Sequence, residues 1–376
     1  MTQIFVVNSG SSSIKYQLVD LETEEAVISG LIERIGEPGS EIVDHVAGMK
    51  TVLDHLGTGN DIVAVGHRVV QGGSLFNSAT LITDEVERQI DELSALAPLH
   101  NPANLLGIRA ARAALPDVPH VVVFDTAFHQ TLPAAAYTYA IDRELAAKYG
   151  VRKYGAHGTS HKFVSEQAAK FLGRPLSELK IVVLHIGNGG SLSAIDGGVC
   201  IETSMGMTPL EGLVMGTRSG DLDPAVLIHL HRQAGMSFDE IDVLLNRRSG
   251  LLGMTGTSDM RDVETAADAG DEVAIAALAV YRHRIVRYLG AYIAHLKGVD
   301  ALVFTAGIGE NDSELRTSVL DGLGFLGIHI DEALNAPRSK KARYISPEGS
   351  PVAVLVVPTN EELEIARQTA AVVAAA

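Results

Sequence analysis

The chain is poor in cysteine, in positive charge and in long apolar runs, and each shortage excludes a class of protein. Its one cysteine, Cys200, cannot form an intrachain disulfide and lies in no metal-ligand spacing, so we expect a buried, inert thiol. Lysine and arginine number 30 against 46 acidic residues, and the net charge of −16 argues against a nucleic-acid or anionic-membrane partner. No apolar run approaches the roughly 20 residues of a membrane span, and no basic, apolar leader opens the chain, so a cytoplasmic location is expected.

What the chain does have is length and apolar content. It contains 376 residues, of which 46% are hydrophobic and 20% are charged, with no low-complexity tract. This length exceeds one ordinary core and suits two lobes, which predicts a well-packed globular protein. Because the whole molecule is acidic, an anionic ligand would need locally concentrated arginine, lysine or metal.

A glycine-rich turn stands at the centre of the chain. Residues 181–196 read IVVLHIGNGGSLSAID, as a strand, a tight loop and a returning strand would. Gly187, Gly189 and Gly190 leave backbone N–H groups uncovered, so a phosphate can approach them closely. A plain β-hairpin turn is the alternative interpretation of this stretch.

The beginning of the chain repeats this pattern. Residues 4–20 read IFVVNSGSSSIKYQLVD, which places Asn8 against His185 and Gly10 against Gly187. The duplication predicts an α/β fold of two similar lobes, each offering a loop to one polyphosphate in a cleft. The layout resembles the superfamily of acetate and sugar kinases, Hsp70 and actin, which implies a duplicated ribonuclease H-like (actin-like ATPase) core.

Polar or glycine-rich clusters follow the predicted strands. They come after six apolar runs, which end at Val7, Gly66, Phe124, Leu184, Phe304 and Val357. Because ligands bind beyond the carboxyl ends of the strands in open α/β sheets, one cleft is expected to gather these clusters.

Helical spacing is found at 83–96, 105–114, 271–297 and 361–373. The third of these is expected to be central and buried, and the last to pack back on the first lobe. We expect an N-terminal lobe of residues 1–148 plus 362–376, and a C-terminal lobe of 149–361 with most of the nucleotide site.

Residues in these clusters meet the needs of phosphoryl transfer, which are phosphate-cradling loops, a divalent cation and fixed positive charge. Asn8 and Glu361 offer hard oxygen ligands suited to Mg²⁺. Asp125 could orient the hydrated metal or act as a base. Arg68 and a second arginine, at 218, suit bidentate contact with a carboxylate or phosphate. A histidine at 157 could donate a hydrogen bond to the transferring group.

Each candidate also has a structural alternative. Arg68 could form a surface salt bridge, and Arg218 could pair with Asp221 or Asp223. His157 could be a buried structural histidine. Asp259 could cap a helix. Two further alternatives are a strand-to-helix turn at Gly307–Asn311 and a cap on the final helix at Glu361.

The motifs together closely resemble acetate kinase, and the resemblance runs essentially end to end. Its family-specific segments keep their order. They are NSGSSSIK at 8–15, GHRVV at 66–70, PLHNPAN at 98–104, FDTAFH at 124–129, HGTSH at 157–161, HIGNGGS at 185–191, TSMGMTPLEGL at 203–213, MGTRSGDLDP at 215–224, SDMRD at 258–262, FTAGIGEN at 304–311 and PTNEE at 358–362.

The resemblance implies a role for each matching residue. Asn8 and Glu361 would bind Mg²⁺, or Mn²⁺ in its place, and Arg68 would contact the substrate carboxylate. Asp125 would be the essential acid, and His157 and Arg218 would stabilise the transition state. His100 falls at the family's active-site histidine. The residues matching the ATP/ADP-binding segments are Lys15, His185, Ile186, Gly187, Asn188, Gly189, Asp259, Met260, Arg261, Gly307, Ile308, Gly309, Glu310 and Asn311. The resemblance also implies a homodimer.

Two positions depart from the family's usual pattern. Gln71 stands where a histidine is common. Ala156 stands where a phenylalanine usually lines the pocket for the methyl group of the acid, while Val70, Leu99 and Pro209 match the rest of that pocket. The smaller side chain predicts better use of propionate, and of butyrate, unless a neighbouring side chain fills the space.

The expected activity is therefore reversible, Mg²⁺-dependent transfer of a phosphoryl group from ATP to acetate. Such a transfer yields acetyl phosphate and ADP. One alternative is a kinase for a longer short-chain acid. Another is a nucleotide-gated ATPase clamp on the same fold, which would show no dependence on small carboxylates.

Overall fold

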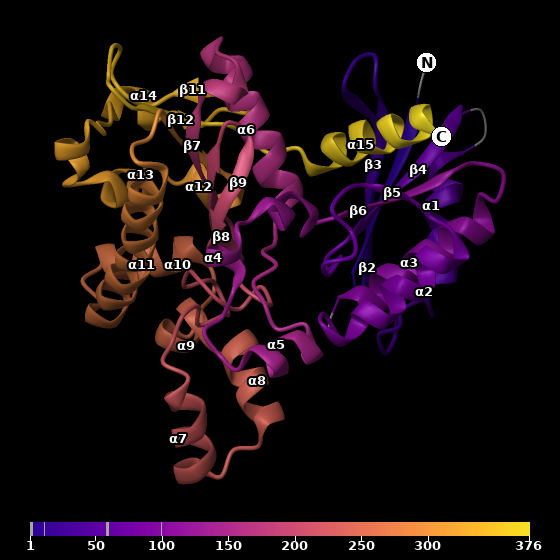
Figure 1. The fold of residues 1–376 in the computed structure, drawn as a ribbon, viewed down its shortest axis with the longest axis horizontal. Coiled ribbons are helices and arrows are strands. Elements are labelled where there is room, and N and C mark those ends of the chain that lie inside the picture. The colour runs from indigo at the N-terminus through magenta and orange to yellow at the C-terminus, as the bar shows by residue number, and fades with distance from the viewer. Residues whose placement is uncertain (1–2, 11, 58–59, 99) are drawn as a thin grey trace. The chain divides into compact units, whose positions relative to one another are not determined.

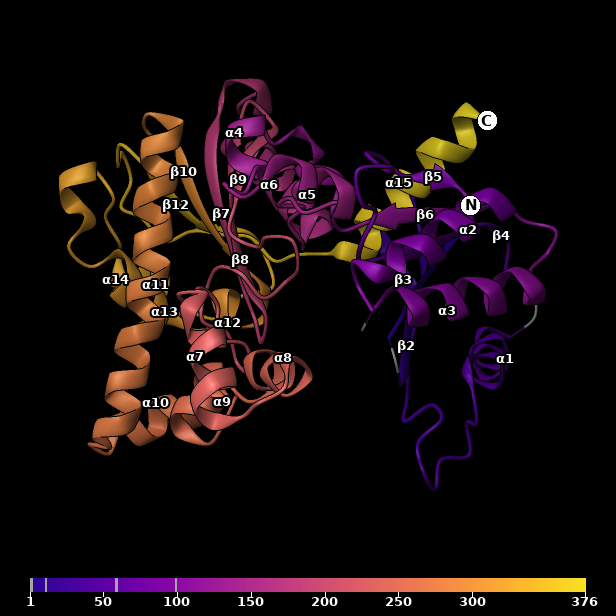
Figure 2. The ribbon, with the colours of Figure 1, turned by 60° about the horizontal axis from the view of Figure 1, so that its bottom comes forward.

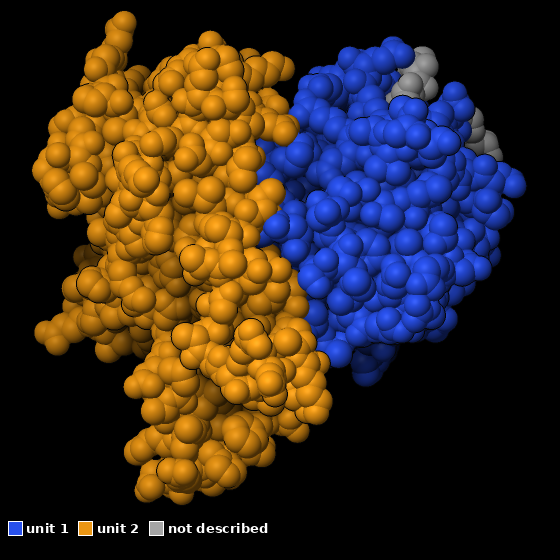
Figure 3. All heavy atoms as spheres, in the orientation of Figure 1, with its two compact units in different colours: residues 1–130, 156–163, 360–376 blue, residues 131–155, 164–359 orange. Residues whose placement is uncertain are grey.

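The computed structural model describes residues 3–10, 12–57, 60–98 and 100–376. By contacts within the chain, these residues form two compact units (Figure 3). Unit 1 comprises residues 1–130, 156–163 and 360–376, and unit 2 comprises residues 131–155 and 164–359. The lobe boundaries predicted at 148 and 361 stay predictions.

Unit 1 is built on one six-stranded sheet (Figure 1). Its strand order is β3-β2-β1-β4-β6-β5. The strands β1, β4 and β6 are parallel, and β2, β3 and β5 run antiparallel to their neighbours. The strand bounds are β1 Gln3–Ser9, β2 Ser13–Asp20, β3 Glu25–Glu33, β4 Ile62–Val69, β5 Thr80–Leu81 and β6 His120–Phe124.

Helices cover both faces of this sheet. The helices α1 (His45–Leu56) and α3 (Asn101–Ala114) pack on one face, where Phe5, Val7 and Val65 meet Ala110 and Ala111. On the other face lies α15 (Glu361–Ala375), whose Ile365 and Thr369 leave no room for a Cβ at Gly66. The prediction that the last helix packs on the first lobe is confirmed. The remaining helices of this part are α2 (Asp84–Glu92), η1 (Leu93–Ala95), η2 (Ala127–Thr131) and the start of α6 (Gly158–Leu172).

Unit 2 repeats the same topology. Its sheet has the order β9-β8-β7-β10-β12-β11, with β7, β10 and β12 parallel and the other three strands antiparallel to their neighbours. The bounds are β7 Lys180–Ile186, β8 Gly190–Asp196, β9 Val199–Thr203, β10 Ala301–Thr305, β11 Arg343–Tyr344 and β12 Ala353–Val356. Strand by strand this is the pattern of unit 1, so the predicted duplication is confirmed.

The longest helix of unit 2 is α11 (Glu272–Leu296), which packs against β7 and β8 (Figure 2). Asp271 caps it, and Leu278, Ile285 and Leu289 are among its buried residues, as the helical spacing predicts. The other helices are α4 Ala134–Tyr137, α5 Arg143–Tyr149, η3 Leu176–Glu178, α7 Ala225–Ala234, α8 Phe238–Arg247, α9 Gly250–Thr255, α10 Met260–Asp268, α12 Ala306–Asn311, α13 Ser313–Leu320, η4 Leu323–Leu326 and α14 Glu332–Asn335.

The six predicted clusters lie at the carboxyl ends of six parallel strands, β1, β4 and β6 in unit 1 and β7, β10 and β12 in unit 2. The strand β4 extends to Val69, past the end predicted at Gly66, so Arg68 lies within the strand, as Asn8 does within β1. Each unit therefore gathers its clusters at the carboxyl edge of its own sheet.

Among the described residues, none of the helices has the length and apolar character to cross a membrane. Cys200 is buried as expected, and burial raises the pKa of its thiol to about 12.

Candidate active site

An arginine surrounded by oxygen ligands forms the centre of the unit 1 site. Arg68, near the end of β4, donates from Nε to Asp125 Oδ1 at 3.0 Å and from Nη2 to Asp125 Oδ2 at 2.5 Å. Its Nη1 donates to Asn8 Oδ1 at 3.3 Å, and Glu361 Oε2 lies 3.9 Å from Nε. Asp125 is 1% exposed, so the pair is a partly buried, bidentate ion pair rather than a surface salt bridge. Three predicted residues thus converge on the fourth.

This cluster contains more negative than positive charge. Glu361 is the first residue of α15, and the next residue, Glu362, pairs with Lys15. Burial, together with the carboxylates of Asp125 and Glu362, raises the pKa of Glu361 to about 7 against the opposing charges of Arg68 and Lys15. A cation bound near these oxygens would offset the repulsion among the carboxylates. Asn360 is the residue that caps α15, so the prediction of a capping role for Glu361 is wrong.

Two buried asparagines hold the loops that carry this cluster. Asn104 on α3 accepts from Val70 N at 3.2 Å and donates to Ser9 O at 2.6 Å, which joins the ends of β4 and β1. Asn101 accepts from Gln71 N at 3.1 Å and donates to Gln71 O at 2.9 Å. Sequence reasoning included both in a motif without assigning a role, because their backbone partners lie about 30 and 95 residues away.

The backbone at His157 is left-handed, with φ of 58°. For a residue with a side chain this conformation costs on the order of 1–3 kcal/mol and is typical of functional sites. The next residue, Gly158, donates its N–H to Asp125 O at 2.9 Å, and a Cβ there would lie 2.2 Å from that oxygen. His157 is therefore fixed beside the segment that carries Asp125.

The predicted acid pocket is only partly described. Val70 and Ala156 are 8% and 3% exposed, and His129 Nε2 donates to Ala156 O at 2.9 Å. Leu99 lies outside the described residues. His100 is the N-terminal cap of α3 and is exposed. Gln71 is buried, and its Oε1 accepts from Gly73 N at 2.9 Å, which shapes the turn after β4.

The first of the unit 2 segments is the hairpin between β7 and β8. His185 and Ile186 are buried at the end of β7, and Gly187 N donates to Gly189 O at 2.9 Å across the turn. Asn188 is exposed at the tip, and its backbone oxygen accepts from Gly216 N. The segment is thus a β-hairpin, as the plain structural interpretation expects. Its role in binding ATP or ADP stays a prediction.

The segment at 259–261 begins α10. Asp259 caps this helix and also pairs with the Arg261 side chain, whose hydrogen bond holds the pKa of Asp259 at about 2. The predicted helix cap is confirmed. Met260 is 4% exposed, whereas the side chain of Arg261 is 83% exposed and open to solvent.

The segment at 307–311 forms the short helix α12 directly after β10. Glu310 Oε1 accepts from Ala306 N at 2.9 Å and from Thr359 N at 3.1 Å, so it joins the ends of β10 and β12. A Cβ at Gly307 would meet no atom within 4 Å, and Asn311 Nδ2 donates to Gly307 O. Ile308 and Gly309 complete the helix. The segment is therefore a short helix that follows the strand directly, and the alternative of a strand-to-helix turn at 307–311 is wrong.

Arg218 is held in a different way from Arg68. Its Nη1 donates to Pro209 O at 2.7 Å, and burial lowers the pKa of its guanidinium. Within the described part of the chain no carboxylate pairs with it. Asp221 instead accepts from Gly212 N and Tyr288, and Asp223 accepts from Ala225 N, so the alternative pairing of Arg218 with Asp221 or Asp223 is wrong.

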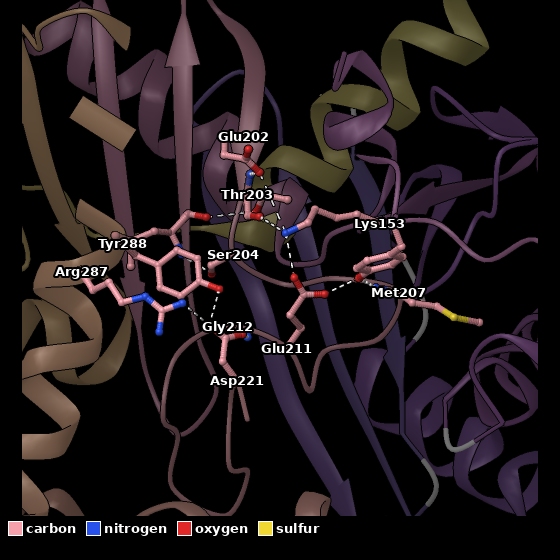
Figure 4. A network of polar contacts seen from close by, with 12 residues as sticks. Lys153, Glu202, Thr203, Ser204, Met207, Glu211, Gly212, Asp221, Arg287 and Tyr288 are labelled. Atoms are coloured by element: carbon pink, nitrogen blue, oxygen red, sulfur yellow. Dashed lines mark hydrogen bonds and ion pairs between the residues drawn. The ribbon is translucent and has the colours of Figure 1, made fainter. Parts of the chain in front are cut away.

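A polar network ties the loop that carries Pro209 and Arg218 to the body of unit 2 (Figure 4). Lys153 donates to Glu211 and to Thr203 O, each at 3.0 Å, and Asp221 Oδ2 accepts from Tyr288 at 2.9 Å. Sequence reasoning missed Lys153 and Tyr288. Neither lies in a cluster after a strand, and their partners are 50 or more residues away.

The duplicated sheet, with clusters at the carboxyl edge of each copy, defines the class as an α/β protein of two similar lobes. The sequence model of the acetokinase family matches residues 3–367. The chain is 61% identical to the acetate kinase of Clavibacter michiganensis and 61% identical to that of Leifsonia xyli, with 100% of both chains covered in each case. The chain therefore belongs to the acetate kinase (acetokinase) family.

Solved structures agree with this assignment. The crystal structure of Porphyromonas gingivalis acetate kinase has a TM-score of 0.95 at 41% identity, covering 99% of this chain and 100% of that one. A propionate kinase from Francisella tularensis has a TM-score of 0.92 at 42% identity, with the same coverage.

Proposed function

We propose that the protein transfers the γ-phosphoryl group of ATP to acetate, giving acetyl phosphate and ADP, and that it also accepts propionate. The observation that carries this proposal is the cluster in which Arg68, Asp125, Asn8 and Glu361 converge. Membership of the acetate kinase family supports it. In unit 2, the hairpin at 185–189 and the segments at 259–261 and 307–311 would bind the nucleotide.

The residues present fit a divalent cation. Asn8 Oδ1 and Glu361 Oε2 both approach the Arg68 guanidinium, and the carboxylates around it outnumber the cations. Mg²⁺ typically takes one or two protein ligands and keeps several waters, so these two side chains would suffice. When bound, Mg²⁺ or Mn²⁺ supplies charge that neutralises the phosphate oxygens.

The chemical difficulty of the reaction is electrostatic. A carboxylic acid with a pKa near 4–5 is already ionised at pH 7, so the acceptor needs little help from a general base. One anion must instead approach another. Arg68 would hold the carboxylate of the acid, while Arg218 and His157 would donate to the oxygens of the transferring phosphoryl group. Asp125 would mainly fix the orientation of Arg68, as its bidentate pairing indicates.

Ala156 supports the acceptance of propionate. It is a small side chain at a buried position of the proposed acid pocket, which Val70, Leu99 and Pro209 would share. An additional buried methylene is worth about 0.8 kcal/mol, roughly a fourfold gain in affinity.

A homodimer, which the family resemblance implies, stays a prediction that size-exclusion chromatography with light scattering would test.

The experiment is incubation with MgATP and one acid at a time, with hydroxylamine present to trap acyl phosphate as a hydroxamate. We expect hydroxamate with acetate and with propionate, and none without acid. Hydroxamate from butyrate at a higher kcat/KM than from acetate would instead favour a kinase for a longer acid.

A further inference from the structure

A buried lysine outside the cluster around Arg68 holds the loop at residues 204–212. Lys153 is 9% exposed, and its ammonium group donates to Thr203 O and to Glu211 Oε1, each at 3.0 Å (Figure 4). A second carboxylate, on Glu202, lies 4.0 Å away. The lysine thus joins the residue before the loop to a residue near its end.

Tyr139 fixes the same loop from a second position. Its hydroxyl donates to Glu211 Oε2 and accepts from Met207 N, the latter at 3.0 Å. Burial and the hydrogen bond to Glu211 raise the pKa of Tyr139, so its hydroxyl keeps the proton that it donates. At Gly206 a Cβ would lie 1.8 Å from Glu211 Oε2 and 2.3 Å from Tyr139 Oη. A side chain at position 206 would therefore displace the Glu211 carboxylate or the Tyr139 hydroxyl.

The loop is connected directly to Arg218. Pro209, two residues before Glu211, accepts from Arg218 Nη1 at 2.7 Å. Arg218 pairs with no carboxylate among the described residues, so this carbonyl is the group that orients its guanidinium. A shift of Glu211 would move the Pro209 carbonyl and release the arginine.

We propose that Lys153 and Tyr139 are positioning residues for phosphoryl transfer, which act through Glu211 and Pro209 to hold Arg218 in its productive orientation. The proposal rests on the proposed function, in which Arg218 stabilises the transferring group. Neither side chain would touch the substrate, and removing the ammonium would leave the arginine present but misplaced.

The test is a double-mutant cycle in the full-length protein with MgATP and acetate. K153M keeps the length of the side chain and removes its charge. We expect it to lower kcat by roughly 10- to 100-fold, as misplacement of a catalytic group by about 1 Å does, with KM for ATP changed less than twofold. Y139F should produce a smaller loss in the same direction. K153R, which can still donate to Glu211, should recover much of the activity.

The cycle separates positioning from stability. If Lys153 acts through Arg218, K153M should cost little further activity in an R218A background. The control is R174A, which removes the ion pair to Asp300 at the opposite edge of the same sheet and should leave kcat unchanged. An equal loss of kcat from K153M with and without Arg218 would overturn the proposal. If K153M does not fold, the same cycle with Y139F decides. Normal turnover in R218A alone would remove the proposed role of Arg218 instead.

Discussion

The two units use the same sheet but hold their arginines by different means. In unit 1, Arg68 is surrounded by side-chain oxygens, and its bidentate partner Asp125 is 1% exposed. In unit 2, Arg218 donates to a backbone carbonyl, and the loop that provides this carbonyl is held by Lys153. A cation can thus be positioned by opposite charge or by loop architecture. The second way leaves the charge uncompensated and available to an anionic group.

Removing each arginine should have the largest effect on activity and should separate the two arrangements. R68A and R218A are each expected to lower kcat by about 10²-fold or more, because a preorganised charge-stabilising donor is lost. Only R68A should also destabilise the fold, by roughly 3 kcal/mol, because it leaves the buried carboxylate of Asp125 unpaired. Steady-state kinetics with urea unfolding of both variants tests this. Equal stability losses would remove the distinction between the units.

The next largest effect is expected from Asn104, whose side chain joins the ends of β4 and β1 through Val70 and Ser9. N104A leaves Val70 N–H and Ser9 C=O without a partner, at roughly 1–3 kcal/mol for each buried group. We expect lower stability and a fall in kcat of about tenfold as Asn8 and Arg68 lose their relative placement. The matched control is N246A, because the half-buried side chain of Asn246 donates only to Asp242, within its own helix, α8. An N104A variant as active as N246A would show that the Asn104 side chain does not position Asn8 and Arg68.

The third prediction concerns the choice between acetate and propionate, which Ala156 of unit 1 is expected to influence. A156F should lower kcat/KM for propionate relative to acetate by about fourfold, the value of one buried methylene. A156V should fall between A156F and the parent chain. The measurement is kcat/KM for both acids with all three proteins. A ratio that is the same in all three would mean that the position does not line the acid pocket.

The smallest expected effect is a pH dependence of stability, which arises from Glu264 beside Asp312 in unit 2. Burial and the carboxylate of Asp312 raise the pKa of Glu264 from 4.5 to about 8, with Glu314 adding to the shift and Arg282 opposing it. The folded protein therefore binds a proton that the unfolded chain releases above about pH 4.5. Its stability should fall as pH rises from about 4.5 to about 8.

The E264Q variant checks this pH dependence. Its amide can donate to Asp312 without titrating, so its thermal midpoint should fall by a few degrees less than that of the parent chain over this range. Parallel curves for the two proteins, recorded by differential scanning calorimetry between pH 4.5 and 8, would contradict the assignment to Glu264.

Local sequence patterns predicted most of the fold and the residues that converge on Arg68. Apolar runs followed by polar clusters marked the parallel strands, and the repeated glycine-containing turn revealed the duplication. Arg68 and Asp125 could be proposed because each stands in a polar cluster at the carboxyl end of a strand of the same sheet. The partner of Arg218 could not be predicted, because a nearby acid such as Asp221 is the natural candidate from spacing, whereas loop folding selects the Pro209 carbonyl. The roles of Lys153 and Asn104 depend on backbone groups brought from distant segments, and such contacts leave no local pattern.

The central claim is that fixed cations allow one anion to accept a phosphoryl group directly from another. The most direct test is the ratio of acyl phosphate to ADP formed with MgATP, measured with and without acetate. We predict one acyl phosphate for each ADP with acetate, and essentially no ADP without it. ADP produced at the same rate in the absence of acid would contradict the account and indicate a nucleotide-gated ATPase.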